Sequence, residues 1–338
     1  MQQILSKFPD CRVAVLGDFF LDKYLDVDPA LAEISVETGK TANQVVSTRC
    51  SPGAAGTVVN NLAALHAGAL YALGFTGDDG EGFELRRALQ NLGCDIRGLQ
   101  TLHDRFTPTY LKPRNCIKGD LAGEHERYDT KNRRPAPAEV QTTVVSHLER
   151  LLAKLDAVIV VDQVNEEECG IVTKMVRERV AGLGERYPGK VFWADSRQRI
   201  GKFRNVIIKV NAQEAVREVY GDHAGAAGNG AVQGAMAELT KRTGRPVFVT
   251  EGSRGIWVSE GQPRLVRAVR VPEPTDPTGA GDSATAGAVL ALCAGANLWE
   301  AALLANLVAS LTVQQLATTG TASPDELGPR LEMWRGQE

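Results

Sequence analysis

Short apolar runs alternate with helix-length segments along most of this chain, and the alternation limits the folds it can adopt. Each run has the length of a strand and ends in polar residues or glycine: 12–17, 70–75, 155–162, 190–195, 205–211 and 245–252. Helical candidates lie between them, one from Gly82 and others near 139–153, 166–182 and 212–220. This order predicts an α/β fold, a mostly parallel sheet with helices on both faces. Ligands bind such sheets where the strands end, so the polar residues closing each run are candidate site residues.

Two segments, approximately 24–50 and 105–131, break this alternation. They are rich in Thr, Val, Tyr and charged residues, with a strand-like pattern and no helix between the strands. Disordered insertions would also interrupt the pattern, but the alternation in TPTYLKPR and GEHERYD favours antiparallel strands. We interpret both segments as a small β-sheet lid over the site. Since no long linker divides the chain, we expect residues 1–338 to form a single domain.

Composition excludes several classes of partner and location. The 338 residues carry 38 Lys and Arg against 41 Asp and Glu, a formal net charge of -3, so we expect no nucleic-acid and no membrane partner. Six cysteines without a C-x-x-C pair are typical of a reducing cytoplasm. The N-terminus lacks a signal-peptide pattern, and the uncharged stretch 301–324 contains enough polar residues to favour a buried helix over a membrane span. We therefore expect a cytoplasmic protein.

The segment DPTGAGDS at 276–283 carries the strongest chemical signal. Gly279, Ala280 and Gly281 are small enough for backbone amides to approach a ligand, and the apolar stretch after them predicts a helix that begins here. Asp282 falls in its first turn. A carboxylate that complements the helix dipole beside a tight turn would explain Asp282 alone. The small-residue trio, with Asp276 upstream, favours instead a phosphate cradle with an adjacent carboxylate base.

This segment resembles the C-terminal signature of the PfkB, or ribokinase-like, family of carbohydrate kinases. Other motifs of that family follow in register: GDFFLD at 17–22, SPGAAGTVVNNLAAL at 51–65, GFTGDDGEG at 74–82, NAQE at 211–214 and VTEGSRG at 249–255. The resemblance implies a ribokinase-like three-layer sandwich with a β-sheet lid. It also implies an enzyme that transfers the γ-phosphoryl group of ATP to a hydroxyl of a sugar or sugar phosphate, with Mg²⁺.

The resemblance implies a role for each matching residue. Asp282 would be the general base, and the amides of Gly279, Ala280 and Gly281 would form the anion hole. The residues implied on the nucleotide side are Asn211, Thr250, Gly252, Gly255 and Asn306. The residues implied on the sugar side are Asp18, Asp22, Gly53, Ala54, Thr57 and Lys112. A solvated turn would also explain Asp18 and Asp22, and a bond to a neighbouring loop would also explain Asn306.

Two further residues are implied in cation binding. Glu214 would hold Mg²⁺ through water. With Asn211 it also fits a helix-capping box, and both interpretations can hold together. Asp276 and the loop at 318–323 resemble the monovalent-cation site of some family members, which leaves a K⁺ requirement open.

Within the family, GDFFLDKY, EISVE, TPTYLK and RYD look most like heptose-7-phosphate kinases, so D-glycero-D-manno-heptose 7-phosphate heads the expected substrates. Some of those enzymes carry a second module with an H-x-G-H motif, which this sequence lacks, so we expect a stand-alone kinase. Where those kinases read R-P-G-G-A-A-N, this chain has Ser51, Ala54 and Thr57, and Arg197 replaces a lysine.

These departures leave the substrate and the activity open. A kinase for another sugar and a non-catalytic sugar- or nucleotide-binding regulator on the same fold remain alternatives. The sequence also leaves open whether Lys112, Arg114 or Arg197 holds a substrate phosphate. Finally, the apolar faces and open edges of the lid strands predict a homodimer that pairs through the lid.

Overall fold

The computed structural model describes residues 1–117, 123–221 and 228–337, which contain two β-sheets. The larger sheet has nine strands in the order β13-β12-β11-β10-β9-β8-β1-β4-β5. Its strands are β1 Arg12–Gly17, β4 Ala69–Gly77, β5 Asp95–Leu102, β8 Ala157–Asp162, β9 Val191–Ser196, β10 Ile207–Asn211, β11 Val247–Thr250, β12 Gly255–Glu260 and β13 Gln262–Arg267. All pairings from β11 to β5 are parallel, and only the edge strands β12 and β13 pair antiparallel.

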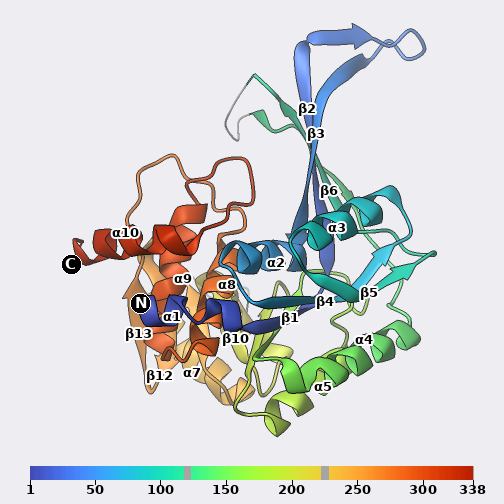
Figure 1. Ribbon diagram of the computed structural model, residues 1–338. Coiled ribbons are helices and arrows are strands. Elements are labelled where there is room, and N and C mark those ends of the chain that lie inside the picture. The colour runs from blue at the N-terminus through green and yellow to red at the C-terminus, as the bar shows by residue number, and fades with distance from the viewer. Residues whose placement is uncertain (118–122, 222–227, 338) are drawn as a thin grey trace.

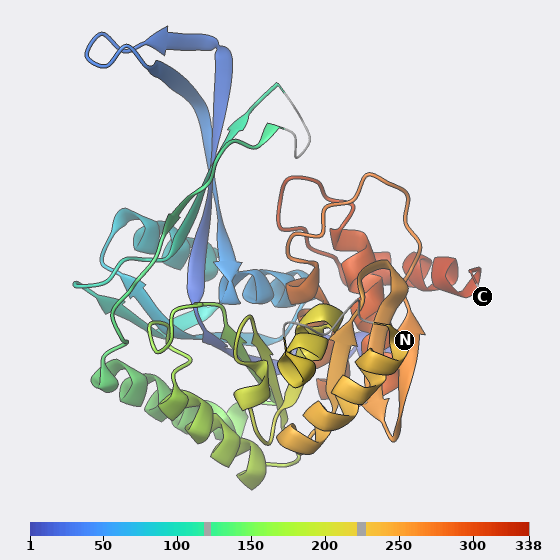
Figure 2. The same cartoon turned by 180° about the vertical axis from the view of Figure 1, so that it is seen from behind.

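Helices cover both faces of this sheet (Figures 1 and 2), as the order of strands and helices predicts. On one face lie α2 Ala55–Ala64, α3 Gly80–Asn91, α8 Ala280–Cys293 and α9 Leu298–Thr312, with α10 Pro324–Arg335 outside them. On the other lie α4 Ala138–Leu151, α5 Lys174–Arg186, α6 Ala212–Tyr220 and α7 Asn229–Thr243. A short α1 Gln2–Leu5 precedes β1, and the 3₁₀ turns are η1 Phe8–Asp10, η3 Leu152–Lys154, η4 Ile200–Lys202 and η5 Gly252–Arg254.

Alternation along each strand divides the core between these two faces. In β1, Val13 and Val15 belong to the core on the side of α2, α8 and α9, whereas Ala14 and Leu16 belong to the core on the side of α4 and α5. Both sets are buried because helices cover both faces of the sheet, which is why residues 13–16 of this strand are all apolar. The architecture is the expected three-layer α/β sandwich with a mostly parallel sheet.

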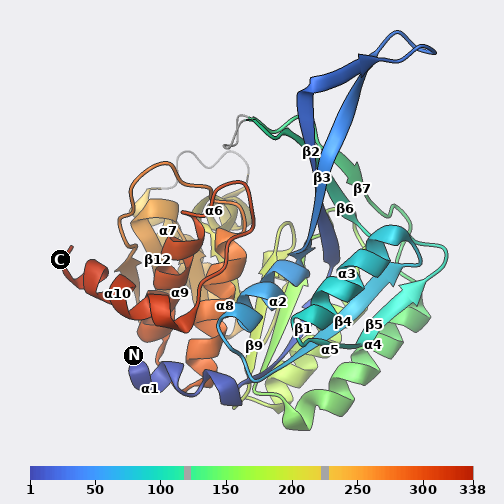
Figure 3. The same ribbon diagram turned by 45° about the horizontal axis from the view of Figure 1, so that its top comes forward.

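A second, smaller sheet projects from this body (Figures 1 and 3), and we refer to it as the lid. Its strands, in the order β3-β2-β6-β7, are β2 Phe19–Ile34, β3 Thr41–Ala54, β6 Thr109–Asn115 and β7 Tyr128–Thr130. The long hairpin β2–β3 extends farthest from the body. Part of the expected lid segment, residues 118–122, lies outside the described residues. That the whole chain forms one domain stays a prediction.

One helix begins later than its sequence pattern predicts. The expected helix near 166–182 is α5 Lys174–Arg186, with Thr173 as its N-cap. Residues 163–171 instead form a loop, because the buried carboxylate of Asp18 accepts hydrogen bonds from the backbone amides of Gln163, Val164 and Ile171. A contact between residues about 150 positions apart therefore sets the start of this helix.

In the part of the chain that the structure describes, no helix is both long enough and apolar enough to cross a membrane. The first half of the uncharged stretch 301–324 lies in α9, which ends at Thr312. Its buried polar side chains bond to backbone carbonyls: Asn306 donates to Val266 O and Ser310 to Leu307 O.

Candidate active site

The amino end of α8 lies close to Lys209 on β10, and it shares a cavity with Thr250 at the end of β11. Gly279 is its N-cap and has a φ of 77°, in the left-handed region that favours glycine. The next residue, Ala280, donates its backbone N–H to Pro277 O at 3.1 Å. One of the three expected anion-hole amides is therefore engaged in the turn that starts the helix.

Asp282 occupies the first turn of α8 and is half-buried. The pKa of its carboxyl is raised to about 7, mainly by burial and in addition by the carboxylates of Asp195 and Asp22. The ammonium of Lys209 opposes them most strongly, and the guanidinium of Arg197 adds a weaker opposing effect. A carboxyl with a pKa near neutral pH suits proton transfer, because the operating pH then lies close to the pKa of the base.

Asp195 and Lys209 are site residues that our sequence analysis did not identify. They are register partners on β9 and β10, and Lys209 Nζ lies 2.5 Å from Asp195 Oδ2. The signal in the sequence was a lysine inside the apolar run 205–211. A lysine is almost never fully buried unless it is paired.

Beside the amino end of α8 is a cavity of about 380 Å³. It contains most of the residues implied on the nucleotide side together with two from the anion hole: Thr250, Gly252, Gly255, Asn306, Ala280 and Gly281. Apolar residues that our sequence analysis did not single out complete its wall: Ile256, Val269, Val271, Ala284, Ala309 and Val313. Asn306 Nδ2 donates to Val266 O at 2.9 Å, which is the neighbouring-loop bond that the sequence left as an alternative for this residue.

Asn211 and Glu214 form the capping box that starts α6. Asn211 Oδ1 accepts from Glu214 N at 2.8 Å, and Glu214 Oε2 accepts from Asn211 N at 3.1 Å. Within the described residues, no group of three or more His, Cys, Asp or Glu side chains is placed to hold a metal ion. A Mg²⁺ ion here would share its coordination with water and nucleotide phosphates, which is how Mg²⁺ is usually bound.

On the lid side, Asp22 and Lys112 form a buried ion pair. Asp22 Oδ1 lies 3.0 Å from Lys112 Nζ, and both side chains are less than a tenth exposed. Lys112 Nζ also donates to the hydroxyl of Tyr24 at 3.2 Å. Gly53 lies against Asp22, because a Cβ on Gly53 would stand 2.8 Å from Asp22 Oδ2. Three of the expected sugar-side residues, Asp22, Gly53 and Lys112, therefore cluster.

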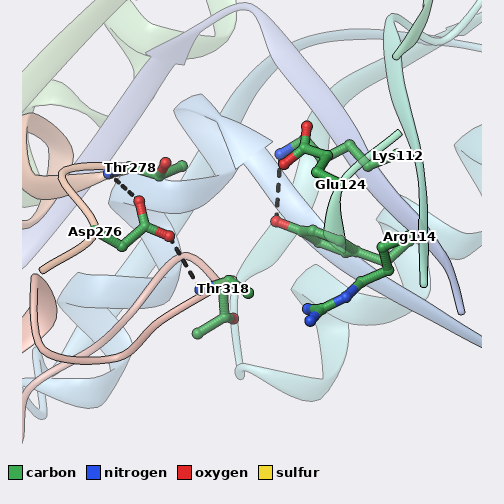
Figure 4. Close-up of a pocket in the computed structure, with 8 residues that line it drawn as sticks. Lys112, Arg114, Glu124, Asp276, Thr278 and Thr318 are labelled. Carbon is green, nitrogen blue, oxygen red and sulfur yellow. Dashed lines mark hydrogen bonds between the residues drawn. The ribbon is translucent and has the colours of Figure 1, made fainter. Parts of the chain in front are cut away.

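A small cavity of about 30 Å³ separates this cluster from the body (Figure 4). Lid residues on one side face loop residues on the other: Tyr24, Lys112, Arg114 and Glu124 against Asp276, Thr278, Ala317 and Thr318. Asp276 is buried, and its two carboxylate oxygens accept from the backbone amides of Thr278 and Ala317. Asp276 thus fastens two loops together, and the K⁺ requirement stays a prediction.

The other expected sugar-side residues have structural roles in the backbone: Asp18 and Thr57 hydrogen-bond to backbone groups, and Ala54 adopts an unusual backbone conformation. Asp18 is occupied by its three amide donors, and burial with the nearby Asp162 raises the pKa of its carboxyl to about 6. Thr57 is buried, and its hydroxyl donates to Pro52 O at 3.3 Å. Ala54 has φ 52° and ψ -117°, a conformation that suits glycine, which the resembling kinases have at this position.

Residues 195–326 match the family model described as pfkB family carbohydrate kinase. Over these residues the chain matches the PfkB family. This match contains Asp282, Lys209 and the residues of the nucleotide-side cavity. The structure also has a ribokinase-like fold, because solved members of that fold superimpose on nearly the whole chain, beyond the residues that the family model matches.

Two solved structures and one curated relative are similar to nearly the whole chain. Phosphofructokinase-2 from Escherichia coli covers 96% of this chain and 99% of its own, with a TM-score of 0.69 and 16% identity. The ribokinase of Arabidopsis thaliana, solved with ribose and ATP, covers 96% and 99%, with a TM-score of 0.67 and 16% identity. The bifunctional protein HldE of Geotalea uraniireducens is 28% identical over 334 residues, which are 97% of this chain. The match spans 64% of the length of that relative.

Proposed function

We propose that this protein transfers the γ-phosphoryl group of ATP to a hydroxyl of a sugar phosphate. The observation that carries this proposal is the position of Asp282, in the first turn of a helix whose Ala280 and Gly281 line a cavity of about 380 Å³. A helix amino terminus favours an anionic phosphate, and its first turn brings the carboxylate beside that phosphate.

In the proposed reaction, the acceptor hydroxyl attacks the γ-phosphorus in line. The new O–P bond forms while the bond from phosphorus to the bridging oxygen of ADP breaks, and Asp282 takes the hydroxyl proton. Amides at Gly279 and Gly281 stabilise the charge on the transferred group. Phosphoryl transfer depends mainly on such positioning and charge neutralisation. Glu214 would hold a Mg²⁺ ion through water, and that ion would supply further positive charge toward the nucleotide phosphates.

We infer the acceptor class from the charges on the lid. Lys112 and Arg114 line the small cavity beside Asp22, and the guanidinium of Arg197 acts on the Asp282 carboxyl. A carboxylate binds sugar hydroxyls, whereas guanidinium and ammonium groups bind phosphate. D-glycero-D-manno-heptose 7-phosphate is our first candidate acceptor, supported by the resemblance to HldE proteins at 25–29% identity.

The test is ADP release with Mg-ATP across a panel of heptose 7-phosphate, hexose phosphates and unphosphorylated sugars. We expect turnover on heptose 7-phosphate, with the unphosphorylated heptose at least about tenfold poorer in kcat/KM because it lacks the charged contacts. Turnover on another sugar would support the kinase activity. It would also indicate that the altered positions Ser51 and Thr57 mark a changed sugar specificity. Sugar and ATP binding without turnover on any panel member would support the regulator instead.

We also propose that the protein forms a homodimer through its lid. Large apolar side chains are exposed near the tip of the β2–β3 hairpin: Leu31, Ile34, Val36, Val45 and Val46. Val36 is 96% exposed. A second copy of the lid would cover them, and sedimentation across micromolar concentrations tests this. A monomer throughout that range would contradict the proposal.

A further inference from the structure

Lys209 is a buried cation on β10, between β9 and β11 in the large sheet. Alternation along β10 sends Ile208 and Val210 into the core beneath α5, α6 and α7. Lys209 therefore faces the opposite side, where α8 lies, and it is 7% exposed. Neither our proposed reaction nor the motifs of the sequence analysis assign this residue a role.

The ammonium of Lys209 lies directly beneath the amino end of α8. A Cβ on Gly281 would stand 2.9 Å from Lys209 Nζ, so the absence of a side chain at Gly281 makes room for the ammonium. On its other side, Nζ contacts Asp195 Oδ2 at 2.5 Å. Lys209 therefore lies between the strand carboxylate of Asp195 and the helix turn that carries Asp282.

The ion pair with Asp195 holds Lys209 at a position that is otherwise unfavourable for a cation. The amino end of a helix is positive, so an ammonium beneath it meets a charge of the same sign. A buried ion pair contributes little stability by itself, since removing both charges from water offsets their attraction. An apolar residue at 209 paired with one at 195 would satisfy packing alone. The retained charge points to a role in the site above it.

We propose that Lys209 is a positioning residue, anchored by Asp195, whose ammonium keeps Asp282 ionised as the base of phosphoryl transfer. The proposal deepens the proposed function and rests on it. The charges that face Asp282 come from every element around it: Asp22 on β2, Asp195 on β9, Arg197 after β9 and Lys209 on β10. Glu214 at the start of α6 faces Lys209 in turn. Two carboxylates oppose ionisation of Asp282, and Lys209 offsets them more strongly than Arg197 does.

The test compares Lys209→Gln and Lys209→Met, which remove the charge, with Lys209→Arg, which keeps it. The first measurement is a carbon-13 titration of the aspartate carboxyls in the substrate-free protein, with the Asp282 signal assigned by its loss in Asp282→Asn. We expect the Asp282 midpoint to rise by about one pH unit or more in the two neutral variants and to stay near the wild-type value in the Arg variant. Lys209→Gln can still donate a hydrogen bond to Asp195, so it serves if Lys209→Met fails to fold.

The second measurement is the pH profile of kcat on the best acceptor. We expect the acidic limb to move with the titration midpoint, so that the neutral variants lose about tenfold more activity at pH 6 than at pH 9. A titration midpoint that is unchanged in Lys209→Gln would overturn the proposal. A profile lowered equally at every pH would also overturn it, since a merely structural lysine would produce that result. Because the titration needs no substrate, a failure of the proposed kinase activity remains distinguishable from a failure of this inference.

Discussion

A Cβ on Gly53 would lie 2.8 Å from Oδ2 of Asp22, so the backbone of β3 approaches this carboxylate more closely than any other residue type would allow. The ion pair with Lys112 fixes Asp22 from its other side. These two contacts hold one carboxylate at the base of the lid, where a sugar hydroxyl pair would meet it.

Substituting Gly53 tests whether this approach positions Asp22 for the sugar. We expect Gly53→Ala to push the Asp22 carboxylate away and to raise KM for the acceptor by about tenfold, because one charge-assisted hydrogen bond is worth about 1.5–3 kcal/mol. KM for ATP should change little, since the nucleotide-side cavity lies beside α8. Steady-state kinetics with each substrate varied separately measure both constants. Equal increases in the two KM values would point to general damage to the fold.

Replacing the neighbouring residue, Ala54, with glycine should stabilise the fold. Ala54 has a φ of 52° with a ψ of -117°, which is strained for any residue with a Cβ. Ala54→Gly should therefore raise the free energy of unfolding by about 1 kcal/mol, less whatever the added freedom of glycine in the unfolded chain removes. Urea unfolding measures the difference. A loss of stability would show that the strain energy relieved at this position is smaller than the entropic cost of ordering glycine on folding.

The proposed base gives the reaction a defined pH dependence. Asp282 must be ionised to take a proton, and burial raises its pKa to about 7. We therefore expect kcat to rise as pH increases through about 7 and to level off above it. Asp282→Asn should lower kcat by about 10²-fold to 10⁴-fold above pH 7, where the wild-type base is ionised, and leave the Kd for ATP within about twofold. Calorimetric titration with ATP gives the Kd.

The same pKa predicts an effect on stability. Because the folded-state pKa of Asp282 lies above its ordinary value of 3.8, its ionisation destabilises the fold as pH rises from about 4 through about 7. Asp282→Asn removes that penalty. We expect the variant to be more stable than wild type at pH 8, by less than the roughly 4 kcal/mol that corresponds to the full change in pKa. The two proteins should converge near pH 4, and a constant difference across this range would contradict the assignment.

Asp18 should act on stability through the loop that it holds. Its carboxylate accepts from three amides, at Gln163, Val164 and Ile171, with distances of 2.8–3.0 Å. Asp18→Asn turns an amide group toward those donors and should lower the free energy of unfolding by about 2 kcal/mol. Hydrogen exchange at the three amides should also accelerate.

A matched control for this change is Asp28→Asn on the lid. Asp28 accepts one amide, that of Ala30, near the surface, so we expect a change of less than about 0.5 kcal/mol. If both variants lost a similar amount of unfolding free energy, the proposal that the Asp18 carboxylate holds the loop would be contradicted.

The sequence predicted the layers of the fold well because each buried strand reads as a continuous apolar run. The strand expected at 12–17 is β1 Arg12–Gly17, and the helix expected near 212–220 is α6 Ala212–Tyr220. Local signals also located the amino end of α8, where small residues and Asp282 follow one another directly. The late start of α5 could not be predicted in this way, because it depends on a carboxylate far away in the sequence.

The charge network of the site was the least predictable part. Lys209 occurs within an apolar run, and only the pairing of β9 with β10 brings it against Asp195. Its relation to Gly281 depends further on how α8 packs over the sheet. Thr57 shows the same limit: its hydroxyl is hydrogen-bonded to the Pro52 carbonyl, and no local pattern distinguishes that from a contact with sugar.

The most direct test of the account is phosphorus-31 NMR of a reaction that contains Mg-ATP, heptose 7-phosphate and either wild-type protein or Asp282→Asn. We predict that the γ-phosphorus signal of ATP decays in the wild-type reaction while a new sugar phosphate ester and ADP appear in equal amounts. The variant should bind ATP and leave both reactants unchanged over the same time. Ester formation by the variant at the wild-type rate would contradict the role of Asp282. ATP and acceptor that persist unchanged with the wild-type protein, for this and every other sugar of the panel, would contradict the kinase itself.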